Sequence, residues 1–152
     1  MPFPASAFAV DADNTWTDGA NVDAHTYAGY TYGYNSALFA QRVHDVLTLI
    51  TFCGAYAGEK PQVDLLALGP AGAWATAARA QAGEAVARAA IDTAGFRFAK
   101  LASARDVNFL PGAAKYGDLP GLLALGAPGA LWLAGEDPMP PGLVSAAYTA
   151  AG

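Results

Sequence analysis

The stretch from Val63 to Gly83 contains the residues whose types and spacing come closest to a reaction site. An apolar run, Val63 to Leu68, ends at Gly69, and an alanine-rich helical pattern follows it. Small residues between a strand and a helix let the chain reverse sharply and place free backbone N–H groups at the start of the helix. Residues 69–73, Gly-Pro-Ala-Gly-Ala, therefore predict either a tight structural turn or a corner able to hold an oxyanion.

Two carboxylates are placed to lie near this corner. Asp92 is expected at the carboxyl end of a second strand, and Asp137 comes just after a third. In a parallel α/β sheet these strand ends meet at one edge, where ligand groups gather. The two carboxylates can then act as acid and base. The alternative is that each one caps a helix or bonds a turn.

The two histidines give less specific patterns. His44 lies beside Asp45 on a predicted helix, either as a base held by that carboxylate or as a surface or interface histidine. His25 lies near Asp23 in a predicted loop, but two residues do not make a metal site. We expect no metal and no cofactor.

The elements that must position these groups follow from hydrophobic periodicity and from glycine and proline breaks. Strand and helix alternate, which predicts an α/β fold: a small three-layer sandwich with a mostly parallel sheet covered on both faces. We expect the corner to join a central parallel strand to the start of a helix. The predicted helices are 36–53, 71–82, 120–125 and 141–151, and the predicted strands are 63–68, 87–93 and 130–134.

Residues 1–35 are rich in Asp, Asn, Thr, Tyr and Gly and predict a loop-rich segment, with a short strand at 7–10. Residues 36–152 then form the α/β part of a single domain. The leading segment contains four closely spaced tyrosines, which form either a ligand-facing wall or a packed edge. They are Tyr27, Tyr30, Tyr32 and Tyr34.

Composition excludes several classes of function. The 152 residues are 54% hydrophobic and 14% charged, with a net charge of −5 and scattered basic residues. This charge gives no footprint for nucleic acid, and no apolar run is long enough for a membrane helix. Cys53 is the only cysteine, which rules out an internal disulfide, and its apolar neighbours predict a buried, inert thiol. We expect a soluble cytoplasmic protein.

A set of motifs in this order resembles the carboxy-terminal half of bacterial α/β-hydrolases of the acetyl xylan esterase-like family. The resemblance covers residues 26 to 152. Its motifs are TYAGYTYGYN from 26, QRVHDVLTLITF from 41, VDLLALGPAGAW from 63, IDTAGFRF from 91, FLPGAAKYGDLPGLLAL from 109 and LWLAGEDP from 131.

The resemblance implies roles for particular positions. The hydrolase corner reads Gly-x-Ser-x-Gly, so Ala71 stands where the nucleophilic serine is expected. Gly72 would supply an N–H to the oxyanion, and Asp137 would take the place of the triad acid. The triad histidine is expected after one more strand, beyond Gly152. A serine hydrolase needs both the nucleophile and the base, so two of the three triad roles are unfilled.

These implications predict a partial α/β-hydrolase fold with weak or absent esterase activity and a small acyl-ester or sugar-ester ligand. The alternative is a non-catalytic domain that binds a ligand or serves in assembly. A sheet with so few strands leaves an edge or an apolar face open, which predicts a homo-oligomer. The other possibilities are that the sequence is part of a longer hydrolase or that a different chain completes the sheet.

Overall fold

The computed structural model describes most of the chain after its first 34 residues and short pieces before that. Within the leading segment, β1 (Ala9–Val10) pairs antiparallel with β2 (Trp16–Thr17). The predicted strand at 7–10 therefore falls partly on described residues. The structure describes residues 9–10, 16–17, 32, 35–56, 62–136 and 139–152.

Helices and strands alternate from residue 38 onward, as predicted. Three short 3₁₀ turns separate them at Gly83–Ala85, Phe98–Lys100 and Ala113–Tyr116. The main elements are α2 (Leu38–Tyr56), β3 (Val63–Ala67), α3 (Ala71–Ala82), β4 (Val86–Asp92), α4 (Asp118–Ala124), β5 (Ala130–Ala134) and α5 (Gly142–Ala151).

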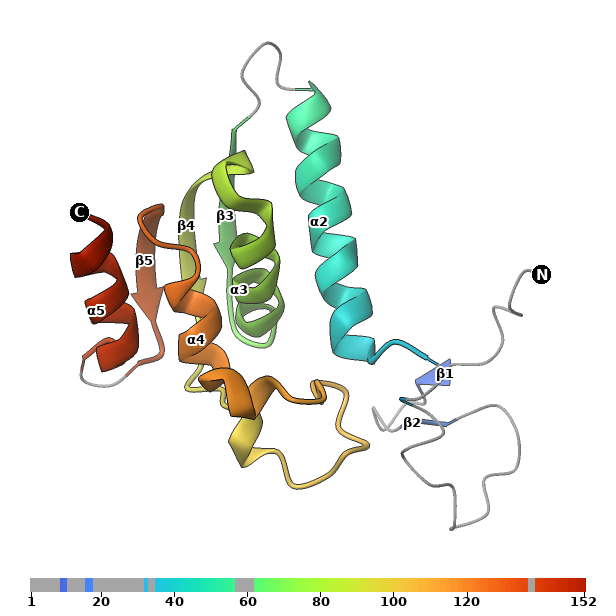
Figure 1. Ribbon diagram of the computed structural model, residues 1–152. Helices are drawn as coiled ribbons and strands as arrows, with labels where there is room; N and C mark the ends of the chain where they lie inside the picture. The colour runs from blue at the N-terminus through green and yellow to red at the C-terminus, as the bar shows by residue number, and fades with distance from the viewer. Residues whose placement is uncertain (1–8, 11–15, 18–31, 33–34, 57–61, 137–138) are drawn as a thin grey trace.

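The strands β3, β4 and β5 form a parallel sheet in that order. Figure 1 shows the three strands side by side, with α3 next to them, α2 beyond α3, and α5 next to β5. The fold is therefore α/β, with a parallel sheet flanked by helices, which confirms the predicted class. The strand before the corner, β3, lies at an edge of the described sheet, so the expectation of a central strand is wrong there.

The core lies on one face of this sheet. On β4 the buried side chains are those of Val86, Ala89 and Ile91, and these pack against Phe39, Ala77 and other residues of the helices. The opposite face is open: Leu66 on β3 is 69% exposed and Trp132 on β5 is 62% exposed. The prediction that these strands are covered on both faces is wrong for the described part, which lacks the second covering layer.

A buried arginine connects α3 with the far end of the sheet. The side chain of Arg79 is 4% exposed and donates to the carbonyls of Gly126 at 3.1 Å and Gly129 at 2.6 Å. It also donates to the hydroxyl of Tyr148 on α5 at 2.9 Å. A Cβ at Gly126 would lie 2.0 Å from Nη1 of the guanidinium and would collide with it, whereas a Cβ at Gly129 would make a tight contact at 3.0 Å from Nη2. No ion pair of Arg79 occurs among the described residues.

The first long helix differs from its prediction in one useful respect. It runs from residue 38 to 56, and Cys53 lies exposed on its surface. The expectation of a buried thiol is wrong, because the helix buries Val43, Ile50 and Gly54 and turns Cys53 outward. His44 is also exposed, as the surface interpretation predicted.

Candidate functional site

The corner at residues 69–73 joins the end of β3 to the first turn of α3, as the sequence predicts. Gly69 has φ +56°, a left-handed conformation in which a side chain is strained. Ala71 begins α3, and its φ is not positive. The sharp change of direction is therefore made at Gly69, two residues before the position where the resemblance places a nucleophile.

Gly72 allows α3 to approach the neighbouring strand. A Cβ at this position would lie 2.0 Å from the backbone oxygen of Asp92 and 2.9 Å from its carbonyl carbon. Such contacts are impossible without movement of the backbone. Glycine at 72 thus has a packing reason that is independent of any chemistry.

The N–H of Gly72 already has a partner. It donates to the carbonyl oxygen of Gly69 at 3.0 Å. An acyl oxygen bound at this corner would have to share or replace that hydrogen bond. The hydroxyl of Thr76, one turn further along α3, donates to the carbonyl of Gly72 at 2.8 Å, so both backbone groups of Gly72 are bonded.

Asp92 ends β4 at the same edge of the sheet. Its Oδ1 accepts the backbone N–H of Ala94 at 2.9 Å. Gly135, with φ +78°, passes so close that a Cβ there would lie 2.5 Å from this Oδ1. Asp92 therefore bonds a turn in this structure, which is one of the two uses that the sequence left open.

A more completely buried carboxylate lies beside it, on Glu136 just after β5. Glu136 accepts two hydrogen bonds from the guanidinium of Arg97, one of them at 2.9 Å between Nη1 and Oε1. The hydroxyl of Thr93 donates to the same Oε1 at 2.6 Å. The side chain of Glu136 is 6% exposed and that of Arg97 is 24% exposed. Sequence reasoning missed this trio, although GFR followed by GED was within the quoted motifs.

The contacts of Glu136 set its charge. Burial raises the pKa of this carboxyl, but the hydrogen bonds from Arg97 and Thr93 outweigh it and hold the pKa below its ordinary value. The hydrogen bond to Glu136 likewise raises the pKa of Arg97. Glu136 is therefore ionised at neutral pH, and its hydrogen bonds suit it to fixing the strand end and not to proton transfer.

Some of the remaining predicted residues are not described by the structure. Asp137 and His25 lie outside the described residues, so the structure does not place the expected triad acid. The ring of Tyr32 packs against the ring of Phe109, with the two ring centroids 5.1 Å apart. The hydroxyl of Tyr32 donates to the carbonyl of Ala104. Burial and the nearby Asp106 raise the pKa of Tyr32. Of the four tyrosines, Tyr32 is the one that the structure describes, and its ring packs against Phe109.

Two properties of the described residues limit the kinds of site they can form. They contain no group of three or more His, Cys, Asp or Glu side chains that could hold a metal ion. No helix in the described part of the chain has the length and apolar character needed to cross a membrane.

Comparison with protein-family models, with curated proteins and with solved structures finds no match for this chain.

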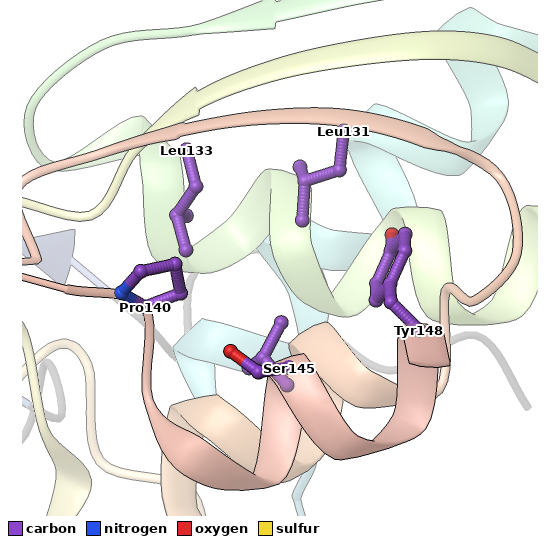
Figure 2. Close-up of a pocket in the computed structure, with 6 residues that line it drawn as sticks. Leu131, Leu133, Pro140, Ser145 and Tyr148 are labelled. Atoms are coloured by element: carbon purple, nitrogen blue, oxygen red, sulfur yellow. The ribbon is translucent and has the colours of Figure 1, made fainter. Parts of the chain in front are cut away.

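A small pocket lies between β5 and α5. Figure 2 shows Leu131 and Leu133 pointing from the strand toward Ser145 and Tyr148 on the helix, with Pro140 at one end. Val144 completes the lining, and the cavity measures about 210 Å³. The walls are mostly apolar, with two hydroxyls. That of Tyr148 is already bonded, since it donates to the carbonyl of Gly129 at 2.9 Å.

Proposed function

We propose that the chain is an α/β domain of the acetyl xylan esterase-like hydrolase type with little or no ester-cleaving activity. The observation that carries this proposal is the place of Ala71. It begins α3 directly after a parallel strand, at the position where the resemblance implies a serine. A methyl group cannot attack a carbonyl carbon.

The surroundings of Ala71 support the same conclusion. The N–H of Gly72 is bonded to Gly69, and the carboxylate of Asp92 is bonded to the turn at Ala94. Residual hydrolysis would need water activated by a carboxylate such as Asp92 or Asp137. Without a positioned base and a free oxyanion donor, such turnover would be slow.

Hydrolysis of p-nitrophenyl acetate tests this proposal. We expect the wild type and Ala71→Ser to hydrolyse the ester at the rate of the buffer blank, because a serine alone gains no base. A fluorophosphonate probe should also fail to label Ala71→Ser. Wild-type hydrolysis clearly above the blank, and lost in Asp137→Ala or Asp92→Asn, would show that the domain is a working esterase.

The pocket between β5 and α5 favours a second candidate function, which is binding of a short acyl group. Its volume and its leucine walls suit a few methylene groups, and the hydroxyl of Ser145 lies at its lining. Butyrate should shift the methyl resonances of Leu131 and Leu133 in a titration followed by NMR. Leu133→Trp should abolish these shifts, whereas Leu125→Trp, at an exposed position after α4, should retain them.

We further propose that the protein acts in the cytoplasm. Its single cysteine cannot form an internal disulfide, which fits a reducing compartment. The exposed Cys53 should accordingly react with a maleimide in protein isolated from cells without added reductant, and an oxidised, unreactive Cys53 would count against the proposal.

A further inference from the structure

The side of the sheet opposite the core carries an ordered set of side chains. On β4, residues 88, 90 and 92 point to this side, because alternate residues of a strand face opposite ways and Ala89 and Ile91 are buried on the other. The strand register aligns Leu66, Ala90 and Trp132 in one row across the sheet. We call this surface, comprising Asp64, Leu66, Arg88, Ala90, Asp92 and Trp132, the open face.

The centre of the open face is apolar and its two ends are charged. Leu66 is 69% exposed and Trp132 is 62% exposed, with the small Ala90 between them. At the amino end of the strands, Arg88 is paired with Asp64 and both side chains are exposed. At the carboxyl end lies Asp92. Parallel sheets are normally covered on both faces, so we expect another part of a protein to cover this surface.

We propose that the open face binds the open face of a second copy of this chain, with the strands of the two sheets antiparallel. A two-fold axis that passes by Ala90 and runs across the strands brings Arg88 of each copy opposite Asp92 of the other. Both contacts join opposite charges, and the same operation lays the apolar rows against each other. The surface is therefore self-complementary, as a two-fold interface requires.

The charges also select this arrangement over its alternative. A two-fold axis along the strands would place Arg88 opposite Arg88 and Asp92 opposite Asp92. Like charges in direct opposition across an interface are unfavourable. The opposite charges of Arg88 and Asp92 on β4 therefore favour the antiparallel orientation over the parallel one. Ala90, between them, is small enough to let side chains of the partner approach.

The size of the open face sets the strength of the contact. Three strands of about five residues give a footprint of roughly 250 Å², at 3.3 Å per residue and 4.8 Å between strands. Stable interfaces bury about 800 Å² on each partner. The dimer is therefore weak and reversible, and its population depends on protein concentration.

Sedimentation velocity of the full chain over a dilution series tests the proposal. We expect monomer at low concentration and dimer at high concentration. Trp132→Glu and, separately, Leu66→Lys should abolish the dimer, with circular dichroism confirming that both variants fold. Leu125→Lys is the matched control, since Leu125 is 68% exposed after α4 and away from the sheet, and it should dimerise as the wild type does.

Substitution of the middle strand tests the orientation. Arg88→Glu opposes Asp92 of the partner in the antiparallel arrangement and should prevent dimerisation. Were the strands parallel across the interface, Arg88→Ala would remove a repulsion and strengthen the dimer. A wild type that stays monomeric throughout, or a dimer unaffected by Trp132→Glu and Leu66→Lys, would overturn the proposal. In the first case the chain itself or a different partner covers the face.

Discussion

Glu136 and Arg97 form a two-point ion pair that ties the end of β5 to the segment after β4. Thr93 donates its hydroxyl to the same carboxylate, so two side chains that follow β4 meet at one buried side chain that follows β5. The side chain of Glu136 is 6% exposed. A buried carboxylate is tolerated at this position because each of its hydrogen bonds comes from a donor that is itself held in place.

Glu136→Gln should lower the free energy of unfolding at pH 7 by about 2 to 3 kcal/mol, since it leaves Arg97 partly buried without its counter-charge. Urea unfolding followed by fluorescence measures the change. Asp64→Asn is the control, because its pair with Arg88 is exposed and such pairs contribute little. Equal effects of the two substitutions would show that burial of Glu136 is not important.

The same pair predicts how stability depends on pH. The pKa of Glu136 is lowered by folding, so its contribution is present above the unfolded-state pKa of about 4.3 and is lost as pH falls through the lower folded-state value. The difference in unfolding free energy between the wild type and Glu136→Gln should therefore be constant from pH 7 to about 5 and shrink below about 4.3. A difference that grows in acid would contradict this sign.

Gly72→Ala should destabilise the fold by about 3 kcal/mol or prevent folding, because the new methyl would overlap the carbonyl of Asp92. Gly142→Ala is the matched control. Gly142 starts α5, a Cβ there meets open space, and alanine favours the helix. Thermal unfolding should separate the two variants clearly. A harmless Gly72→Ala would mean that α3 does not approach β4 as closely as described.

Ala94→Gly should raise the free energy of unfolding by about 1 kcal/mol. Ala94 and Gly95 have φ +48° and +67°, and Phe96 donates its N–H to the carbonyl of Thr93 at 2.9 Å across them. Both central residues of this turn are left-handed, which strains alanine but not glycine. Thermal unfolding measures the gain, and Ala99→Gly, at an exposed position in the 3₁₀ turn that follows, should give none.

Much of the fold follows from local patterns. The bounds of α3 and β5 agree with their predictions because glycines mark the ends of the helix and an apolar run of five residues forms the strand. Exposure was harder to predict. Leu66 and Trp132 look like core residues in the sequence, but whether a second layer covers them depends on groups distant along the chain.

At the candidate site, too, the local elements were predicted and the contacts between distant residues were not. The sequence correctly predicted the corner between β3 and α3 and the place of Asp92 at the end of β4. It could not show that the N–H of Gly72 bonds to Gly69, because that depends on turn geometry. It also missed Glu136, since a carboxylate 39 positions from its arginine is recognised only when the two strand ends are brought together.

Arg79 connects α5 to the buried centre of the domain. Its guanidinium bonds to Tyr148 of α5 and to the two glycine carbonyls before β5, all from a buried position on α3. Detaching α5 would leave that cation with one fewer partner and expose it to a partly apolar gap. The terminal helix is thereby coupled to the middle of the domain, and we expect its amides to exchange with solvent through cooperative opening and not by fraying from the end.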